Sequence, residues 1–395
     1  MKFIILVPDG AADWPLPAHG GMTPLEAAHT PNMDFLAKNG ICGTALTIPS
    51  GMPAGSDVAN YSILGYDPRL YYTGRGPLEA ASMGLELGPS QVAFRCNLVT
   101  EEKGRLLDFS AGHISSQEAA ELMQTLQEEL GDKDTSFHAG VSYRHLLLLE
   151  GRDFLDARCI PPHDVVGERV EDILPEGPGA ERLVSLMDRA RPLLSGHEVN
   201  RRRRSRGERP ANLIWPWGQG KSPQLPTYQE KYSLNGAIIT AVDLIKGLGL
   251  CAGLDVVEVP GATGYYDTDY EAKALYALNS LHDKDLVYIH VEAPDEAGHE
   301  GDWDAKVQAL EDFDGRIVES LLNEVSRSSE DFRFLVVPDH YTPIEVRTHA
   351  PDPVPFALYY LEADPDAGSS FSEKGVREGS FSKLPGWQLM DLLVK

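Results

Sequence analysis

The stretch Phe332-Arg333-Phe334-Leu335-Val336-Val337-Pro338-Asp339-His340 decides how we expect this chain to fold. Its first six residues form a largely apolar run of strand length, which is typical of a strand buried inside a parallel sheet. The carboxylate and imidazole that follow would lie at the carboxyl end of this strand, where open α/β sheets bind ligands. Neighbouring side chains diverge there, so Asp339 and His340 can approach one cation from two directions or serve two cations.

A second group of metal-ligand residue types is formed by Asp295-Glu296-Ala297-Gly298-His299 and the later His349. Asp295 and His299 are four residues apart, so one face of a helix can present both to one cation. A mixture of carboxylate and imidazole ligands suits Mn²⁺ or Zn²⁺ better than an all-oxygen cage for Mg²⁺ or Ca²⁺. We therefore expect two divalent cations, with Mn²⁺ as the first choice and Zn²⁺, Mg²⁺ or Co²⁺ as alternatives.

The composition is typical of an enzyme from a reducing compartment. The 395 residues include 60 acidic and 35 basic ones, and the formal charge of -25 disfavours nucleic acids and anionic membranes as partners. An anionic substrate would then need a local basic pocket. The four cysteines are dispersed and form no C-x-x-C pair, which indicates neither a disulfide framework nor a zinc ribbon. Without a signal segment or an apolar run of roughly 20 residues, a cytoplasmic location is expected.

Strand-length apolar runs alternate with helical periods towards both ends of the chain, which indicates an α/β protein. Residues 3–7 are a predicted strand, and residues 236–247 are predicted to be helical. From residue 87 to residue 231 the predicted strands are shorter and an Arg- and Pro-rich loop occurs. The Gly- and Ser-rich segment 364–382 is predicted to be a mobile loop.

The simplest organisation is one core interrupted by an insertion. We expect residues 1–86 and 232–395 to form a metal-binding core with a central, mostly parallel sheet flanked by helices. Residues 87–231 would form a smaller inserted α+β domain that binds substrate and acts as a lid.

Two further residues are candidates for the same site. Asp9 directly follows the first predicted strand, although an aspartate in Pro-Asp-Gly is also a common turn residue. Ser56 lies where a Gly- and Pro-rich loop enters a predicted helix, so it can cap that helix. It can also act as a nucleophile whose hydroxyl is deprotonated by a bound metal, with the helix N-terminus favouring the phosphate that forms. The two roles are compatible.

At this point the chain resembles a known family, the cofactor-independent (2,3-bisphosphoglycerate-independent) phosphoglycerate mutases. It looks closest to their archaeal-type branch, within the alkaline phosphatase superfamily. The family's order is seen in Val7-Pro8-Asp9-Gly10, Gly55-Ser56-Asp57-Val58-Ala59-Asn60, Asp295-Glu296-Ala297-Gly298-His299, Asp339-His340 and His349. Supporting stretches include Tyr72-Thr73-Gly74-Arg75-Gly76-Pro77-Leu78-Glu79-Ala80, Phe94-Arg95-Cys96-Asn97-Leu98, Ser142-Tyr143-Arg144-His145 and Pro260-Gly261-Ala262-Thr263-Gly264.

The resemblance implies an alkaline-phosphatase-like core that holds two metals. One would be surrounded by Asp9, Ser56, Asp339 and His340, and the other would be held by Asp295, His299 and His349. In that family the metal-bound serine takes the phosphoryl group from the substrate and returns it to a different oxygen of the same glycerate. The implied reaction of glycolysis and gluconeogenesis interconverts 3-phosphoglycerate and 2-phosphoglycerate through a phosphoserine intermediate, without 2,3-bisphosphoglycerate.

The inserted domain should carry the groups that bind a small phosphorylated acid. Arg144 and His145 begin a predicted strand, and arginine suits bidentate recognition of phosphate or carboxylate. An ion pair with a surface carboxylate is the structural alternative for Arg144. Within the basic stretch after residue 200, Arg209 and Asn212 look like part of the family's own pattern. His290 lies on the strand that leads to Asp295 and is expected to be a core histidine or one that supports the ligands.

Three alternative functions follow from the same residues. Relatives of similar architecture have been proposed as homoserine kinases of threonine biosynthesis, which would pass phosphate from the same serine to an amino alcohol. A poorly closed lid would instead make the chain a metal-dependent phosphomonoesterase. A catalytically inactive binding module is the alternative outside enzymes, and the presence of all seven expected ligands speaks against it.

Overall fold

The computed structural model describes residues 1–395 and divides the chain into two compact units. The core unit comprises residues 1–72 and 224–395, and the inserted unit comprises residues 73–223. None of the helices combines the length and the apolar character that crossing a membrane requires.

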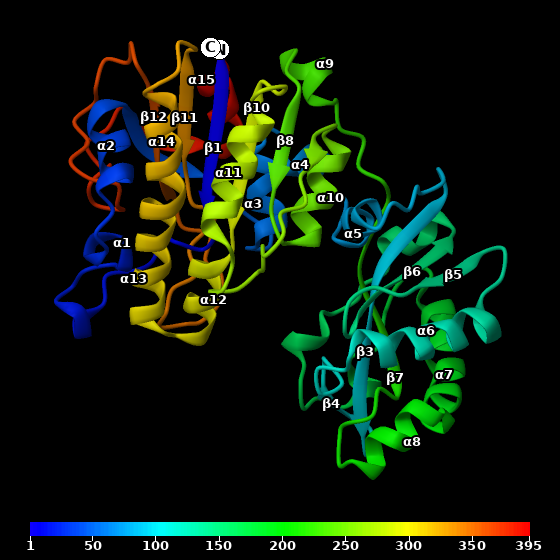
Figure 1. The fold of residues 1–395 in the computed structure, drawn as a ribbon. Helices are drawn as coiled ribbons and strands as arrows, with labels where there is room; N and C mark the ends of the chain where they lie inside the picture. The colour runs from blue at the N-terminus through cyan, green and yellow to red at the C-terminus, as the bar shows by residue number, and fades with distance from the viewer. The chain divides into compact units, whose positions relative to one another are not determined.

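The core unit is built on an eight-stranded sheet in the order β13-β2-β12-β11-β1-β10-β8-β9 (Figure 1). Strand β1 pairs in parallel with β10 and β11, whereas β12 runs antiparallel to β11 and β2. Strand β10 is buried along its whole length, which accounts for its continuous apolar run. The strands are β1 (Lys2–Pro8), β2 (Ile41–Leu46), β8 (Gly236–Ile239), β9 (Asp255–Val256), β10 (Leu286–Val291), β11 (Phe332–Val336), β12 (Val354–Tyr360) and β13 (Phe381–Pro385).

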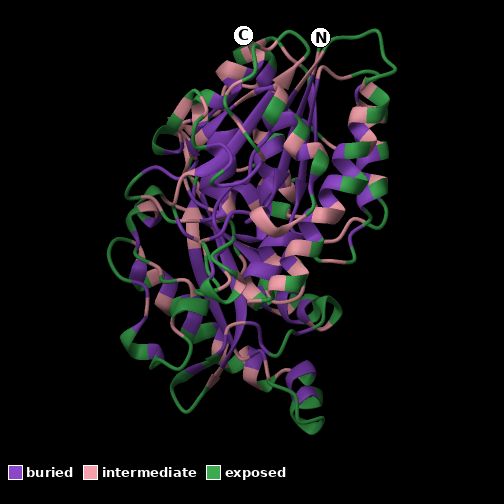
Figure 2. Cartoon of the chain, turned by 90° about the vertical axis from the view of Figure 1, so that its left-hand side faces the viewer, coloured by how far each residue is buried: buried purple, intermediate pink, exposed green.

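Helices cover both faces of this sheet, which confirms the predicted α/β core (Figure 1). One layer contains α2 (Pro31–Asn39), α11 (Tyr270–Ser280), α13 (Trp303–Asp312) and α14 (Glu319–Val325), and the π-helical turn Phe313–Val318 joins the last two. The other contains α3 (Ser56–Ile63), α10 (Asp243–Cys251) and α15 (Leu389–Val394). The remaining helices are α1 (Pro24–Ala27), α4 (Pro68–Tyr71), α9 (Tyr228–Tyr232) and α12 (Ala293–Glu300). Buried residues follow the strands, and exposed residues lie on the outer helices and loops (Figure 2).

The carboxyl ends of three neighbouring strands bring the predicted ligands together. Strands β1, β10 and β11 are parallel neighbours, so their carboxyl ends lie at one edge of the sheet. Asp9 follows β1, Asp295 lies in the first turn of α12 just after β10, and Asp339 follows β11. Strand ends on a parallel sheet therefore position all three carboxylates.

The inserted unit has an antiparallel sheet of its own, as predicted for an α+β insertion. Strand β3 pairs with β4, β6 and β7, and β5 pairs with β6. Apolar residues of β3, β7, α6 and α7 form its separate hydrophobic core. Its strands are β3 (Gln91–Glu102), β4 (Arg105–Asp108), β5 (Thr135–His138), β6 (Arg144–Glu150) and β7 (Leu213–Gly220), and its helices are α5 (Gly76–Ser82), α6 (Ser116–Leu130), α7 (Ala180–Gly196) and α8 (Glu198–Ser205).

The division between the units lies earlier in the chain than the boundaries expected from the sequence. Helix α5 packs on β3 so closely that a Cβ atom on Gly76 would come within 2.3 Å of the Ala93 carbonyl oxygen. This helix therefore belongs to the inserted unit. At the other end Tyr228 of α9 is buried and its hydroxyl donates a hydrogen bond to Leu64 O, so α9 belongs to the core unit.

Two local predictions are wrong. Residues 236–247 are not one helix, because β8 occupies the first four positions and α10 begins only at Asp243. A continuous apolar run is compatible with a buried strand as well as with a buried helix, and the parallel pairing with β10 favours the strand. The segment 364–382 is irregular as expected, but it is not a free loop, because Phe371, Glu373 and Val376 are buried.

Candidate active site

The first candidate metal cluster joins the ends of β1 and β11. Asp9, Asp339 and His340 are buried, and each offers one ligand atom within 4.8 Å of the others. His340 Nε2 is 3.4 Å from Asp9 Oδ1 and 3.5 Å from Asp339 Oδ2. Burial lowers the pKa of His340 to about 4 despite the opposing charge of Asp339, so the ring is neutral at pH 7. Two carboxylates and a neutral imidazole therefore converge on one point.

Ser56 completes this cluster. It is the first residue of α3, and Gly55 occupies the N-cap position, so Ser56 is not the capping residue. Its Oγ lies 3.0 Å from His340 Nε2. One turn further along α3, Asn60 Nδ2 donates hydrogen bonds to Ser56 O and to Asp339 Oδ2. The hydroxyl thus faces the cluster, and Asn60 ties its helix to a predicted ligand.

The first cluster holds more negative charge than its hydrogen bonds neutralise. Asp9 Oδ1 is buried and has no hydrogen-bond partner. Burial raises the pKa of Asp9 well above its ordinary value, and the carboxylates of Asp339 and Asp295 raise it further. A divalent cation would relieve this repulsion and supply the missing partner, so the residues fit such an ion.

The second candidate cluster consists of Asp295, His299 and His349. Asp295 and His299 lie four residues apart on α12, as their spacing predicts. His299 Nε2 is 3.2 Å from Asp295 Oδ2 and 3.0 Å from His349 Nε2. His349 Nε2 lies 3.5 Å from Asp295 Oδ1, so the three side chains form a closed triangle.

Backbone carbonyl groups fix how the two imidazoles of this cluster face each other. His299 Nδ1 lies 3.0 Å from Arg347 O, and His349 Nδ1 lies 3.4 Å from Ala54 O. A carbonyl oxygen only accepts, so both Nδ1 atoms carry protons. In the neutral rings both Nε2 lone pairs therefore point at one position beside Asp295, where a cation fits. Burial opposes protonation of His299, but Asp295 outweighs it and raises the pKa of His299 to about 9, so without a cation this ring carries a second proton at pH 7, which a bound cation would displace.

A buried network supports the first cluster from the direction of β10. His290 Nε2 is 3.4 Å from Asp9 Oδ2, and His290 Nδ1 is 3.2 Å from Glu292 Oε1. Lys273 Nζ donates hydrogen bonds to Glu292 Oε2 and to His290 O. His290 and Lys273 are fully buried. The prediction that His290 is a core histidine is confirmed, and its ring lies beside the predicted ligand Asp9.

Comparisons with known proteins agree on one family. The family model for 2,3-bisphosphoglycerate-independent phosphoglycerate mutase matches residues 37–200. The chain is 52% identical over 396 residues to the curated 2,3-bisphosphoglycerate-independent phosphoglycerate mutase of Methanosarcina barkeri, and all of both chains is covered. The chain belongs to this family, whose members are isomerases.

Solved structures of similar chains support the assignment to this mutase family. A protein from Pyrococcus horikoshii is 31% identical, with a TM-score of 0.85 and coverage of 99% of this chain and 96% of that one. The cofactor-independent phosphoglycerate mutase from Thermoplasma acidophilum is 27% identical, with a TM-score of 0.66 and coverage of 100% and 99%. The likeness therefore spans both units.

In this mutase the four residues predicted to bind substrate all lie in the inserted unit, and three of them have local partners. The buried His145 accepts a hydrogen bond from Gly140 N at Nδ1, and burial lowers its pKa to about 3. Asn212 Oδ1 accepts a hydrogen bond from Glu101 N, and Asn212 Nδ2 donates one to Glu101 O. Arg209 pairs with Asp108 at 2.7 Å. Arg144, the first residue of β6, is exposed and forms no ion pair within 4.0 Å.

Two arginines that the sequence reasoning did not assign lie near Arg144. Burial lowers the pKa of Arg95, Glu79 raises it, and the neighbouring Arg75 and Arg144 lower it further. The guanidinium groups of Arg75 and Arg95 lie 5.8 and 4.6 Å from the ring centroid of Trp217. An arginine in the middle of the buried strand β3 was the available signal, because arginine is rarely buried without a specific role.

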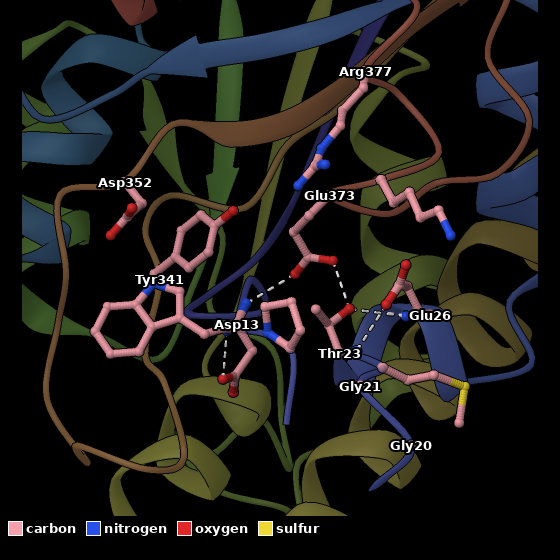
Figure 3. Close-up of a pocket in the computed structure, with 13 residues that line it drawn as sticks. Asp13, Gly20, Gly21, Thr23, Glu26, Tyr341, Asp352, Glu373 and Arg377 are labelled. Carbon is pink, nitrogen blue, oxygen red and sulfur yellow. Dashed lines mark hydrogen bonds between the residues drawn. The ribbon is translucent and has the colours of Figure 1, made fainter. Parts of the chain in front are cut away.

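A separate hollow of about 430 Å³ opens on the core unit (Figure 3). Figure 3 shows the Glu373 carboxylate between Asp13 and Thr23, where it accepts hydrogen bonds from Asp13 N and Thr23 Oγ1. Burial raises the pKa of Glu373 to about 7. None of the predicted metal ligands lines this hollow, so it is not part of the two clusters.

Proposed function

We propose that this chain interconverts 3-phosphoglycerate and 2-phosphoglycerate through phospho-Ser56, without 2,3-bisphosphoglycerate. The observation that carries the proposal is the Ser56 hydroxyl, which lies 3.0 Å from His340 Nε2 beside a cluster of carboxylates in a member of the mutase family. The hydroxyl is partly exposed, so a substrate can reach it.

Asp9, Ser56, Asp339 and His340 would hold one divalent cation, and Asp295, His299 and His349 would hold the other. When bound, two such cations lower the pKa of a coordinated hydroxyl and stabilise charge on the attacking and leaving oxygens. Mn²⁺ is our first choice because the ligands mix carboxylate and imidazole.

The chain's own residues prepare the serine for transfer. Asn60 holds both Ser56 and Asp339, and the Tyr288 hydroxyl in turn donates a hydrogen bond to Asn60 Oδ1. Ser56 therefore stays close to the cluster, because Asn60 links it to the buried side chains of Asp339 and Tyr288. The N-terminus of α3 also favours the negative charge of a phosphoserine through its unpaired N–H groups.

The transfer needs no external phosphate donor. In the first half, Ser56 Oγ bonds to phosphorus while the bond from phosphorus to the C3 oxygen of the glycerate breaks, and the proton that Ser56 loses is balanced by the one that the C3 oxygen takes up. In the second half, the C2 hydroxyl loses its proton and attacks the phosphoserine, and Ser56 regains a hydroxyl. Because the glycerate must turn between the two halves without leaving, a closed and water-poor site is required.

The inserted unit would supply that enclosure. We assign the glycerate's anionic groups first to Arg144, which is exposed at the start of β6, and to the neighbouring Arg95, which has the carboxylate of Glu79 beside it. Arginine binds phosphate and carboxylate through paired N–H groups. His145, Arg209 and Asn212 would then shape the unit that presents these arginines.

The test is turnover by purified protein with Mn²⁺ and 3-phosphoglycerate, followed as 2-phosphoglycerate by coupling to enolase. Ser56→Ala is expected to lower the rate at least about 10³-fold while the protein still binds Mn²⁺. The matched control is Ser62→Ala in the same helix, whose hydroxyl donates to Thr47 O and should not affect transfer. Wild-type turnover by Ser56→Ala would remove Ser56 from the mechanism. Phosphorylation of homoserine, or release of free phosphate in place of 2-phosphoglycerate, would replace the proposed reaction.

A further inference from the structure

A single hydroxyl lies between the two candidate metal clusters. Thr342 is fully buried, and its Oγ1 is 2.5 Å from Asp295 Oδ1 in the second cluster. The same oxygen is 3.2 Å from Nδ1 of His340 in the first cluster. Thr342 thus contacts one ligand of each cluster through one atom.

The chemistry of these groups decides the direction of both hydrogen bonds. A threonine hydroxyl has one proton to donate, and an ionised carboxylate can only accept. The proton of Thr342 therefore goes to Asp295, and its oxygen must accept a proton from His340 Nδ1. His340 is then the tautomer with its proton on Nδ1, and its Nε2 lone pair faces Ser56 Oγ, 3.0 Å away.

Two neighbouring glycines leave the space that Thr342 and its hydroxyl occupy. A Cβ atom on Gly10 would lie 2.5 Å from both Thr342 Oγ1 and Asp295 Oδ1, and Gly10 has a φ of +60°. On the other side, a Cβ atom on Gly298 of α12 would lie 2.4 Å from Thr342 O. Any side chain at either glycine would displace the threonine or its partner.

A buried lysine fixes the backbone of the threonine. Lys306 Nζ donates hydrogen bonds to Thr342 O at 2.8 Å and to Asp13 Oδ2 at 2.9 Å. Asp13 Oδ2 also accepts from Ile344 N, two residues beyond the threonine. The backbone around Thr342 is therefore fixed independently of any bound ion.

We propose that Thr342 is a positioning residue that couples the two clusters by orienting Asp295 and by holding His340 with its Nε2 lone pair towards Ser56. Loss of the hydroxyl would free Asp295 to rotate and His340 to change tautomer, so both clusters would lose ligand geometry together. Supporting groups that orient ligands in this way change metal affinity about 10–100-fold when they are removed. The inference rests on the proposed metal binding and does not depend on turnover.

The test compares Thr342→Val, which keeps the shape without the hydroxyl, with Thr342→Ser, which keeps the hydroxyl. Mn²⁺ binding to the full chain is measured by the electron paramagnetic resonance signal of the free ion. Thr342→Val is expected to weaken both sites by about 10–100-fold, and Thr342→Ser is expected to stay within about threefold of the wild type. Weakening of only one site by Thr342→Val, or equal weakening by both variants, would overturn the coupling.

A second measurement tests the inference without any substitution of Thr342. Long-range ¹H–¹⁵N correlation of the imidazoles in the wild-type protein reports which nitrogen of His340 is protonated, and His340→Gln assigns the signal by its loss. A proton on Nδ1 is expected, and a proton on Nε2 would overturn the inference. Neither readout requires 2-phosphoglycerate formation, so a negative mutase assay would count against the proposed reaction and not against this role of Thr342.

Discussion

The core unit and the inserted unit leave opposite charges without full compensation. In the core unit, Asp9 Oδ1 has no hydrogen-bond partner, and the Nε2 atoms of His299 and His349 face each other at 3.0 Å. In the inserted unit, Arg144 is exposed without an ion pair and lies near Arg95, whose carboxylate partner is Glu79. The first arrangement is suited to cations and the second to an anion.

This difference shows which predicted residues already have structural partners. His145 accepts a hydrogen bond from Gly140 N at Nδ1, whereas its buried Nε2 has no hydrogen-bond partner. Arg209 and Asn212 form an ion pair and hydrogen bonds within the inserted unit, so recruiting them to a substrate would leave a buried group or an acid without its partner. The predicted metal ligands have the opposite property, because their charges need a further partner. We therefore expect uncompensated charge to be a better guide to the functional residues than residue type alone.

The largest expected effect is the difference between substitutions of two buried acids, Asp339 of the core unit and Asp108 of the inserted unit. Asp339→Asn removes a charge that the cation needs, so we expect activity to fall at least about 10³-fold and one Mn²⁺ per chain to be lost. Asp108 accepts from Ser110, Gly112 and Arg209, so Asp108→Asn should cost stability, about 1–3 kcal/mol, and leave both ions bound. Equilibrium dialysis with Mn²⁺ and the enolase-coupled assay measure both. Equal metal loss in the two variants would contradict the comparison.

Stability should differ between the units in the same way. Lys306→Met would leave Asp13 buried without its positive partner, and breaking such a pair costs about 3–5 kcal/mol. Arg209→Met breaks an ion pair whose arginine side chain is 52% exposed, and such a pair is worth at most about 1 kcal/mol. Urea unfolding of both variants at pH 7.5 measures the difference. A loss for Arg209→Met as large as that for Lys306→Met would show that the inserted unit depends on its ion pairs equally.

The strand ends of the core unit could be predicted because their signal is local. Phe332–Val336 is a largely apolar strand, and two of the predicted ligands lie within four residues of its end. Residues 236–247 were assigned wrongly because their pattern does not contain the pairing of β8 with β10. The position of α5 likewise depends on its contact with β3, which no local pattern specifies.

The candidate site was predictable to the same extent. The candidate ligands follow from residue type, spacing and order, but the tautomers of the histidines among them depend on carbonyl groups from distant segments, such as Ala54 O beside His349. The role of Thr342 also needs three segments to meet, namely those of Gly10, Gly298 and Thr342 itself. Sequence identified the candidate groups, and tertiary contacts determine how these groups are oriented.

Glu373 is a buried acid of the core unit that is not a predicted metal ligand, so it tests the effect of burial without metal binding. Its pKa is about 7 in the folded chain and ordinarily near 4.5, so from pH 4.5 to pH 7 the unfolded chain releases this proton and the folded chain keeps it. Stability therefore falls as pH rises through this window. Glu373→Gln stays neutral, so from pH 5.5 to pH 7.5 its stability should rise relative to wild type by roughly 2 kcal/mol. Urea unfolding across this range tests the expectation, with Mn²⁺ binding unchanged as the control. A constant difference between the two chains would show that Glu373 has an ordinary pKa.

The smallest effect concerns the inserted unit and tests whether uncompensated charge also marks its substrate site. Arg144→Gln removes an exposed cation that has no ion pair, so we expect KM for 3-phosphoglycerate to rise about tenfold with stability unchanged. Asn212→Ala removes hydrogen bonds to the Glu101 backbone, and it should cost about 1–3 kcal/mol while leaving KM within about twofold. Steady-state kinetics and urea unfolding of both variants distinguish the two roles.

The opposite result would be informative about the inserted unit. If Asn212→Ala raised KM and Arg144→Gln did not, residues with local partners would be the ones that meet the substrate. Binding would then have to exchange a hydrogen bond within the chain for one to the glycerate, at a cost in affinity. Exposed cations without carboxylate partners avoid this cost, because an anion replaces only water around them. For this reason we expect the exposed Arg144, and not the paired residues, to set the affinity for the phosphorylated acid.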